Sequence, residues 1–508
     1  MTHYDVAIIG SGFSASILAA ALGRAGRRVI MFDRKLHPRF AIGESSTPLA
    51  DLLLERMAGE FGLPELRSLS RWGIWKRELP QVRCGKKRGF SYFQHQRGCG
   101  FEDSIRHDRS LLVAASVNDE VSDTHWLRSD TDAWLFQLAC EHGVDFCKVD
   151  GIEDVKEQDH GWECKIRVGD SSRIFEMDFM VDASGSAAVL PTMLRLNPIT
   201  DQMRTNNRVV YGHFDRVQPM SSILAGQPYL KTNQDPFDCD DAAQHHLIDE
   251  GWFWMLRFDH GITSVGAVLD RDMDCSCRGL TAEKTWERLL EDYPTLSALM
   301  SNANLVAPLG GQGAQLAEID RVSRCYPKAG GKSWFLLPST AGIVDPLHST
   351  GIAHALIGVQ RIAKMLLGEG RSCSASEISA GTSYSRSTVA EVLWIDRIVA
   401  CAYQAKRLSF DWFYAACCLY FLPAIETERL LHEENQIRDG FLCECDAFYQ
   451  ELVMWFETKT IELKSSKTDA DIEAAVEEFR KRIETRNVAG LLEPGTNNRI
   501  ARSVAPKS

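Results

Sequence analysis

Gly10, Gly12 and Ala15 form the spacing G-x-G-x-x-A directly after a short apolar stretch near the N-terminus. In such a pattern the first glycine allows a tight turn, the second lets the backbone approach a pyrophosphate, and the small third residue lets a helix pack closely on a strand. The predicted helix has Ser14 in its first turn, and its free N–H groups can bind phosphate oxygens. A second apolar stretch ends at Asp33, whose carboxylate can accept from a ribose hydroxyl. These residues predict a dinucleotide site.

Two later turns could approach the same cofactor. The apolar segment 179–181 runs into Asp182, and Gly185 follows in a turn where the backbone can come close to a ligand. Asp345 follows another apolar segment, 334–337, and its carboxylate could meet a hydroxyl of the cofactor. Each turn alone is equally compatible with an ordinary strand-to-helix turn. Only their occurrence together therefore indicates a cofactor site.

Arg128 stands at the start of a predicted helix that runs to His142. Its planar guanidinium could fork onto phosphate oxygens or hold the sugar chain of the cofactor. Asp130 and Asp132 follow closely, so an ion pair at the start of the helix is the structural alternative. Both interpretations stay open at this point.

The elements that must hold these residues divide the chain into three interleaved units. Strands alternate with helices in the cofactor-binding unit, which predicts an α/β, Rossmann-like fold. Between its segments lie strand patterns such as 208–214 and 264–270, which favour a second, mostly antiparallel sheet that holds the substrate. From residue 375 onward the pattern is helical, and we expect the last residues to be frayed. The predicted ranges are 1–80, 110–200 and 325–370 for the cofactor-binding unit, 81–109 and 201–324 for the sheet unit, and 371–508 for the helical region.

Composition and charge narrow the class of protein. The 508 residues are 44% hydrophobic and 25% charged, as in ordinary globular proteins, and the formal net charge of −12 argues against nucleic acid as the main partner. We find no signal peptide, and the apolar segment 412–422 is too short to span a bilayer, so we expect no membrane association and a cytoplasmic location. The 15 cysteines lack the spacing of zinc ligands, which predicts reduced thiols and no metal site.

Taken in this order and at this spacing, the three turns resemble the FAD-binding fold of flavin monooxygenases of the hydroxybenzoate hydroxylase and glutathione reductase type. The resemblance implies FAD rather than NAD as the cofactor. It also agrees with the lack of a second nucleotide-binding pattern, since Gly310–Gly313 is not followed by a predicted helix. Reducing equivalents would then have to arrive by another route.

Within that superfamily the chain resembles the flavin-dependent halogenases over nearly its whole length. It is most similar to bacterial halogenases of free phenols, of the phloroglucinol type, and less similar to the tryptophan halogenases. The motifs that carry the resemblance are HPRFAIGESSTP at 37–48, CGKKRGFSY at 84–92, GWFW at 251–254 and DPLHSTG at 345–351. The resemblance implies an enzyme that uses FADH2, O2 and chloride or bromide to make hypohalous acid, and that halogenates an electron-rich aromatic compound such as a phenol. A separate flavin reductase would supply FADH2 by diffusion.

Two alternatives to this activity stay open. An aromatic hydroxylase could use the same reduced flavin and O2 without a halide. A flavin-binding protein without catalysis is the other alternative, because the tryptophan motif of the chain is altered at its end.

The resemblance assigns the halide to Thr350 and Gly351, and Ser349 adds a hydroxyl and an N–H group in the same turn. It assigns to Lys87 the capture of hypohalous acid, either by a hydrogen bond or as a haloamine, because the pKa of an amine falls on burial. Lys86 should face the opposite side of the same strand. The halide turn and Lys87 are thus the expected reactive pair.

Further side chains are expected beside the flavin or the substrate. Glu44 could polarise the lysine or the hypohalous acid, or could cap its own loop. Trp252 and Trp254 are expected to crowd the flavin so that it does not hydroxylate the substrate directly. Because the Ile-Pro that usually follows them in the family is missing, the strand should continue through Arg257. His348 stands where tryptophan halogenases carry a glutamate, which argues against tryptophan as the substrate. Its imidazole could take a phenol proton or serve as a hydrogen-bonded spacer.

Overall fold

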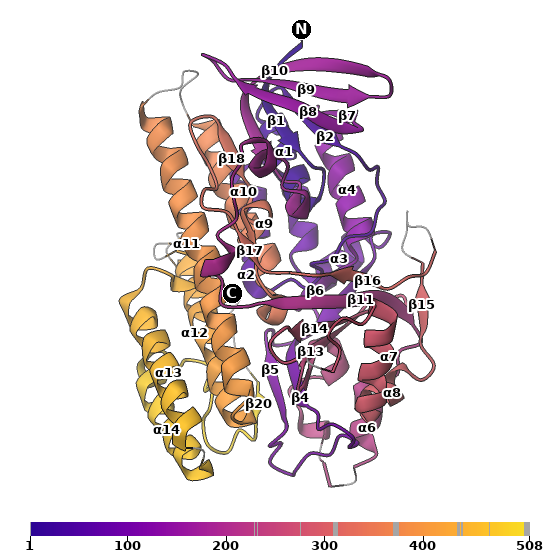
Figure 1. Ribbon diagram of the computed structural model, residues 1–508, viewed down its shortest axis with the longest axis vertical. Helices are drawn as coiled ribbons and strands as arrows, with labels where there is room; N and C mark the ends of the chain where they lie inside the picture. Colours follow the sequence, from indigo (N-terminus) through magenta and orange to yellow (C-terminus); the bar gives the residue numbers. More distant parts are fainter. Residues whose placement is uncertain are drawn as a thin grey trace.

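Two large β-sheets, two small two-stranded ladders and a set of helices make up the described part of the chain (Figure 1). The computed structural model describes residues 2–501 except 228, 231, 275, 308–312, 369–374, 434–436, 438–439 and 467. Most of the Gly310–Gly313 segment lies outside these residues, and the chain continues from it into the short strand β16 (Ala317–Ile319). The predicted mixed α/β class is confirmed.

The first sheet has seven strands and carries the predicted dinucleotide turn. In spatial order the strands are β7 (Asp145–Lys148), β2 (Val29–Asp33), β1 (Thr2–Ile9), β10 (Ser171–Asp182), β9 (Trp162–Val168) and β8 (Gly151–Glu157), with β18 (Trp334–Leu336) also paired to β10. The strands β7, β2, β1, β10 and β18 are parallel, whereas β9 and β8 are antiparallel. Helix α1 (Phe13–Arg24) packs against both α4 (Arg128–Glu141) and α10 (Gly351–Leu367) and buries its apolar residues there. Parallel strands covered by helices are typical of a Rossmann-like fold.

The second sheet has nine strands and lies below the first in Figure 1. In spatial order the strands are β15 (Asn304–Val306), β11 (Asn207–Asp215), β14 (Ile262–Asp270), β13 (Gly251–Arg257), β12 (Ala242–Ile248), β4 (Gly89–Gln94), β5 (Ser110–Ala114) and β20 (Arg499–Ile500), and β16 pairs with β11. Only the β12–β4 and β5–β20 pairs among the described strands of this sheet are parallel. All of β12 is buried although its sequence AAQHHLI contains three polar residues, which is why its pattern escaped prediction.

The motif at 84–92 that contains Lys87 does not form one strand, because the strand pairing changes at Arg88. Strand β3 (Cys84–Lys87) pairs with β6 (Asp123–Trp126) in a separate two-stranded ladder, whereas β4 begins at Gly89 in the nine-stranded sheet. A Cβ at Gly89 would lie 2.1 Å from the Val113 carbonyl oxygen, so the glycine allows the neighbouring strand to approach closely. The break directs Lys87 toward the first unit and leaves the next residues in the nine-stranded sheet.

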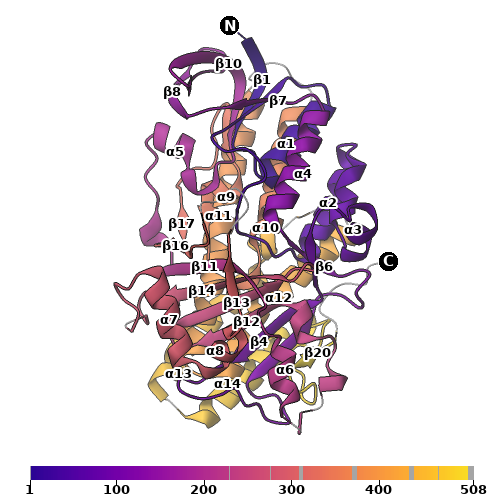
Figure 2. The same cartoon turned by 90° about the vertical axis from the view of Figure 1, so that its right-hand side faces the viewer.

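Long helices of the C-terminal region run beside both sheets (Figures 1 and 2). They are α11 (Ala375–Lys406), α12 (Phe410–Glu433), α13 (Ala447–Ser466) and α14 (Asp469–Ile483). The other helices are α2 (Pro48–Glu60), α3 (Trp72–Glu78), α5 (Val189–Met193), α6 (Met220–Ala225), α7 (Ala282–Asp292), α8 (Pro294–Met300) and α9 (Pro338–Ala341), and the strands β17 (Arg324–Cys325) and β19 (Gly342–Ile343) form a small ladder. Helix α11 contacts α9, α10 and α12, and α12 contacts α2. The helical region therefore ties the two sheets together.

Two pairings depart from the predicted division of the chain. Strand β5, inside the range 110–200 expected for the cofactor-binding unit, belongs to the nine-stranded sheet. Strand β20, inside the range 371–508 expected to be helical and frayed at its end, pairs with β5 in the same sheet. Such partners lie far apart in the sequence, and no local pattern indicates them.

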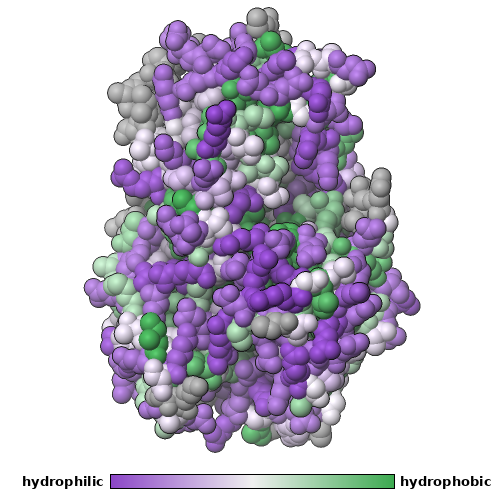
Figure 3. All heavy atoms as spheres, in the orientation of Figure 1, coloured by the Kyte–Doolittle hydropathy of each residue, from purple (hydrophilic) through white to green (hydrophobic). Residues whose placement is uncertain are grey.

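The face of the molecule shown in Figure 3 is covered mainly by hydrophilic side chains, with hydrophobic ones in small groups. Large hydrophobic side chains that are exposed, such as Ile105, Val117 and Ile461, come from different elements. Among the described helices none combines the length and the apolar character that crossing a membrane requires.

Candidate active site

The first glycine turn, between β1 and α1, packs tightly against the turn that follows β10. Gly10 has φ +105°, and a Cβ there would lie 2.6 Å from the Ala183 carbonyl oxygen, so glycine is required. Gly12 is the N-cap of α1 and makes no side-chain cap, which leaves N–H groups of the first turn available to an anion. Ser14 and Ala15 are buried in that turn. This arrangement has the form of a pyrophosphate-binding turn.

The carboxylate of Asp182 holds the turn that follows it through hydrogen bonds to the backbone. Asp182 is fully buried, and its oxygens accept from the backbone N–H groups of Ser184 and Leu190, each at 2.7 Å. Burial raises its pKa. Gly185 has φ +60°, and its N–H donates to the Thr340 hydroxyl at 3.0 Å. The turn is thereby fixed beside the first glycine turn.

Asp33 ends β2 and is tied to the same place. Its carboxylate accepts from the Ser11 hydroxyl at 2.8 Å and from the Lys35 N–H at 3.0 Å, and it pairs with Arg39 at 2.7 Å. Burial opposes the charge, but the hydrogen bonds from Arg39, Lys35 and Ser11 hold the pKa of Asp33 below its usual value. Ser11 lies inside the glycine turn, so the carboxylate is placed next to that turn.

Arg128 links three segments of the cofactor-binding unit. Its guanidinium donates to Asp132 through two hydrogen bonds of 2.7 and 2.9 Å, and to the carbonyl oxygens of Ile42 and Gly43 at 2.7 and 3.1 Å. A Cβ on Gly12 would lie 3.8 Å from the same guanidinium. The ion pair at the helix start is thus formed, with Asp132, and the arginine also lies beside the glycine turn.

The loop 43–47 joins the predicted halide turn to the predicted catalytic lysine. The hydroxyl of Ser349 donates to that of Ser45 at 3.1 Å. The Lys87 ammonium donates to the carbonyl oxygen of the next residue, Ser46. Motifs that are far apart in the sequence are thereby brought to neighbouring residues of one loop.

Lys87 is completely buried. Burial lowers its pKa from 10.5 to about 8, although the charges of Asp123 and Asp51 oppose the shift. Its Nζ lies 4.1 Å from the centre of the Phe90 ring. A buried amine with a lowered pKa is a recurrent feature of catalytic lysines.

Lys86, the neighbouring residue, has the opposite environment. It is partly exposed and pairs with Asp119 at 2.7 Å and with Asp241 at 2.8 Å. These two carboxylates help to raise its pKa, against the effect of burial. The prediction that the two lysines face opposite sides of the strand is confirmed.

The predicted halide turn forms the N-terminus of α10. It follows the single-turn 3₁₀ helix η6 (Pro346–His348), and Ser349 takes the left-handed conformation with φ +54°. Thr350 is the N-cap of α10, and Gly351 begins the helix. A Cβ on Gly351 would meet no atom within 4 Å, so the helix start is open there. An open helix N-terminus with exposed N–H groups suits an anion.

Glu44 forms a buried pair that the sequence analysis did not anticipate. One oxygen of Glu44 lies 2.8 Å from Nε2 of His213 in β11. His213 also packs against Phe40 and Phe258 with ring centres 4.9 and 5.8 Å apart. The pair joins the 43–47 loop to the substrate sheet, and no spacing in the sequence relates its two members.

Asp345 is fully buried and bonded to the protein on both oxygens. It accepts from the Leu347 N–H at 2.9 Å, from the Asn207 amide at 2.6 Å and from the Tyr403 hydroxyl at 2.8 Å. Burial raises its pKa to about 6. Tyr403 in turn accepts from the Trp252 indole at 2.8 Å. Tyr403 lies in the helical region and escaped the sequence analysis, which had no signal for this connection.

The two indoles of the tryptophan motif lie side by side on β13. The centres of Trp252 and Trp254 are 6.2 Å apart, and Trp254 donates to the Ser264 hydroxyl at 3.0 Å. Strand β13 continues through Arg257, as predicted from the missing Ile-Pro, and Arg257 pairs with Asp240 at 3.0 Å.

His348 is buried and lies flat against Tyr420, with ring centres 4.6 Å apart and an interplanar angle of 1°. Among the described residues neither of its ring nitrogens has a hydrogen-bond partner. Burial lowers its pKa to about 3. The hydrogen-bonded spacer is therefore not what the structure contains.

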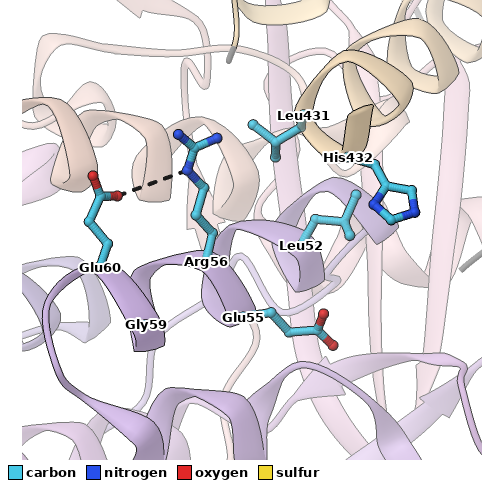
Figure 4. A pocket seen from close by; sticks show the side chains of 7 residues that line it. All are labelled: Leu52, Glu55, Arg56, Gly59, Glu60, Leu431 and His432. Atoms are coloured by element: carbon cyan, nitrogen blue, oxygen red, sulfur yellow. Dashed lines mark ion pairs between the residues drawn. The ribbon is translucent and has the colours of Figure 1, made fainter. Parts of the chain in front are cut away.

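A separate surface pocket of about 510 Å³ lies between α2 and the end of α12 (Figure 4). Figure 4 shows Arg56 and Glu60 of α2 paired at 3.9 Å, with Leu431 and His432 of α12 beside them. None of the predicted site residues lines this pocket. It therefore does not take part in the site.

Fold and site together define an α/β dinucleotide-binding protein with an attached sheet, in which a buried lysine and the turn before α10 contact neighbouring residues of one loop. The family model described as tryptophan halogenase matches residues 125–418. Because this match covers more than half of the chain, the protein belongs to the tryptophan halogenase family. The predicted resemblance to halogenases is confirmed at this level.

Curated relatives are about a quarter identical to the chain over the aligned residues. The tetracycline 7-halogenase of Kitasatospora aureofaciens is 26% identical over 357 residues, covering 69% of this chain and 61% of that protein. The monodechloroaminopyrrolnitrin halogenase PrnC of Pseudomonas fluorescens is 26% identical over 373 residues, covering 72% of this chain and 62% of that protein. The matches thus span about three fifths of the length of these relatives.

Solved structures share the fold over nearly the whole chain. The halogenase PltM, in a complex with phloroglucinol and FAD, matches with a TM-score of 0.82 and 21% identity over 99% of both chains. The flavin-dependent brominase Bmp2 matches with a TM-score of 0.62 and 19% identity, over 90% of this chain and 100% of that one. At this identity the likeness establishes the fold alone.

Proposed function

We propose that the protein is a flavin-dependent halogenase, which makes hypohalous acid from O2 and chloride or bromide and halogenates an electron-rich aromatic compound, a phenol. The observation that carries the proposal is that fully buried Lys87 and the halide turn contact neighbouring serines of one loop, Ser46 and Ser45. Membership of the halogenase family supports it.

FAD fits the first unit because Gly10 has no room for a side chain and the first turn of α1 has no side-chain cap, which leaves a cradle for a diphosphate. Bound as FADH2, it would activate O2, which is the oxidant that converts a halide to hypohalous acid. The residues proposed to hold it are Gly10, Gly12, Ser14, Ala15, Asp33, Arg128, Asp182, Gly185 and Asp345.

The halide is proposed to bind at the start of α10. The N–H groups of Thr350 and Gly351 and the hydroxyls of Ser349 and Thr350 can donate to an anion, and the positive end of the helix favours it. The open space at Gly351 leaves the helix start accessible.

Lys87 is proposed to hold and transfer the halogen. As an ammonium it donates a hydrogen bond to hypohalous acid. As a neutral amine it attacks the halogen: an N–X bond forms, the O–X bond breaks, and the amine proton leaves with hydroxide as water. The aromatic carbon then takes the halogen as the N–X bond breaks, and the ring proton goes to the amine. A pKa of about 8 makes both protonation states accessible near neutral pH.

Glu44 and the two indoles are proposed to guide this chemistry. Glu44, which His213 holds in place, would polarise the hypohalous acid or the lysine. Trp252 and Trp254 would crowd the flavin and keep the substrate from direct hydroxylation. A phenol suits the reaction because its oxygen increases the electron density of the ring.

The test combines the protein with a flavin reductase, NADH, FAD, bromide and a panel of phenols. Mass spectrometry should detect products with the isotope pattern of bromine, and these should disappear when bromide is omitted. Hydroxylated products without bromine would contradict the proposal and favour an aromatic hydroxylase. A separate reductase is part of the proposal, so photoreduced FAD should replace both reductase and NADH. We also propose a cytoplasmic location, where NADH for the reductase is available.

A further inference from the structure

The imidazole of His348 is buried without a hydrogen-bond partner among the described residues. It is 1% exposed, and neither ring nitrogen has a hydrogen-bond partner among the described residues. A buried polar atom without a partner costs about 1–3 kcal/mol, so native proteins rarely keep one without a role. Nearby Asp345, equally buried, is bonded on both oxygens.

The backbone holds His348 in this place firmly. It ends the 3₁₀ helix η6, in which Asp345 accepts from the Leu347 N–H and the Ser349 N–H donates to Pro346 at 2.9 Å. The next residues form the halide turn. These backbone hydrogen bonds therefore hold the imidazole at a defined position.

Aromatic rings connect His348 to the lysine. His348 stacks on Tyr420, whose ring centre is 6.1 Å from that of Phe90. Phe90 in turn lies 4.1 Å from Lys87 Nζ. Ligand sites typically combine such apolar and aromatic walls with a few polar groups that fix the orientation of the ligand.

From this arrangement we infer that His348 is a specificity-determining residue, whose unpartnered ring nitrogen accepts a hydrogen bond from the hydroxyl of a phenolic substrate. The inference rests on the proposed function and adds to it the group that distinguishes a phenol from its ether. Tyr420 and Phe90 supply the apolar walls, and Phe90 also contacts the Lys87 ammonium.

The chemistry of the imidazole suits this role. Burial holds the pKa of His348 at about 3, so the ring is neutral at pH 7. A neutral imidazole has one donor and one acceptor nitrogen, and the acceptor matches a phenolic O–H. A methyl ether has no proton to donate and would leave the nitrogen without a partner.

The experiment measures binding by calorimetry to the FAD-loaded protein without reductant or halide. The ligands are phloroglucinol and its trimethyl ether, which lacks O–H groups. We expect the wild-type protein to bind phloroglucinol about tenfold more tightly, the effect of one hydrogen bond in a buried site. His348→Phe keeps a flat ring against Tyr420 and should lose this preference, whereas His348→Gln keeps an acceptor and should retain most of it.

The matched control is His95→Phe. His95 is also a buried histidine whose Nδ1 has no partner among the described residues, but its Nε2 is bonded to His246 at 2.9 Å, and its substitution should leave the preference unchanged. Should His348→Phe not fold, His348→Leu takes its place in the same comparison. Equal binding of both ligands to the wild type, or an undiminished preference without the imidazole, would overturn the inference.

The same measurements separate this inference from the proposed function. A protein that shows the expected preference but brominates none of the phenols would contradict the halogenase proposal and leave the role of His348 intact. A protein that brominates phloroglucinol with unchanged kcat/KM after His348→Phe would contradict the role of His348 alone.

Discussion

The cofactor side and the substrate side of the site treat their buried polar groups differently. Around the glycine turn, Asp33, Asp182 and Arg128 are all bonded to protein partners. Around the aromatic rings, Lys87 is buried with a lowered pKa and His348 has no hydrogen-bond partner among the described residues. These three groups are held by protein partners, whereas Lys87 and His348 are kept in costly states. Such unfavourable states concentrate where chemistry requires them.

Removal of the Lys87 amine should have the largest effect on activity. Lys87→Met keeps the length and apolar stem of the side chain but removes the nucleophile and donor, so bromination should fall by about 10³-fold, in the range of lost acid–base or nucleophilic catalysis. The measurement is kcat/KM for bromination with photoreduced FAD. Lys86→Met is the matched control and should change the rate by less than about twofold, because its amine pairs with surface carboxylates. Equal losses in both variants would remove the distinction between the two faces of β3.

The same substitution should stabilise the protein at neutral pH. Unfolded Lys87 has a pKa of 10.5 and folded Lys87 one of about 8, so between these values the unfolded chain binds more protons and the stability of the wild type rises with pH. Below pH 8 the buried, charged lysine lowers the free energy of unfolding by its full amount, about 3 kcal/mol for this difference in pKa. Chemical unfolding should therefore show Lys87→Met more stable than wild type by about that amount at pH 7, with the gain shrinking toward pH 10.5. A gain that did not change with pH would contradict the lowered pKa.

Gly10→Ala tests the cofactor side through geometry rather than charge. The new Cβ would meet the Ala183 carbonyl oxygen at 2.6 Å in a backbone with φ +105°, so we expect a loss of about 3 kcal/mol in stability and at least about tenfold weaker FAD binding. Gly26→Ala is the control, because Gly26 also has positive φ but has open space around it, and it should cost about 1 kcal/mol without affecting FAD. Thermal unfolding and flavin fluorescence titration give the two quantities. Unimpaired FAD binding by Gly10→Ala would exclude the closed turn as the cradle.

Tyr403→Phe should have the smallest effect, since it removes one hydroxyl between the two regions. The Trp252 indole and one oxygen of Asp345 each lose a partner, which costs about 1–2 kcal/mol. If Tyr403 positions Trp252 against the flavin, the amount of hydrogen peroxide released per brominated product should rise about fivefold to thirtyfold, the factor to which 1–2 kcal/mol corresponds. A loss of stability with an unchanged ratio of peroxide to product would limit Tyr403 to a structural role.

Local patterns were sufficient for those parts of the molecule that local interactions determine. The strand, glycine turn and helix around Gly10, the opposite faces of Lys86 and Lys87, and the continuation of β13 through Arg257 follow from spacing and alternation. Each depends on residues that are close together in the sequence.

Partners from distant segments escaped the sequence analysis. Glu44 meets His213, and Asp345 meets Tyr403, through the packing of whole units on one another. The break at Arg88 likewise arises because β3 and β4 find different partner strands. Contacts of this kind depend on the three-dimensional arrangement, which no periodicity in a single sequence specifies.

Strand β20 is the last described strand of the nine-stranded sheet to be synthesised, so the sheet cannot be completed before it emerges. It covers β5, and Arg499 fixes it there by donating to the Ser110 hydroxyl at 2.9 Å and pairing with Asp235 at 2.7 Å. During synthesis, residues 110–114 leave the ribosome hundreds of residues before 499–500, so one side of β5 must wait with its backbone groups unpaired. An uncovered strand edge is a template for pairing with another chain. That edge of β5 is therefore open to pairing with another chain until the final described strand emerges.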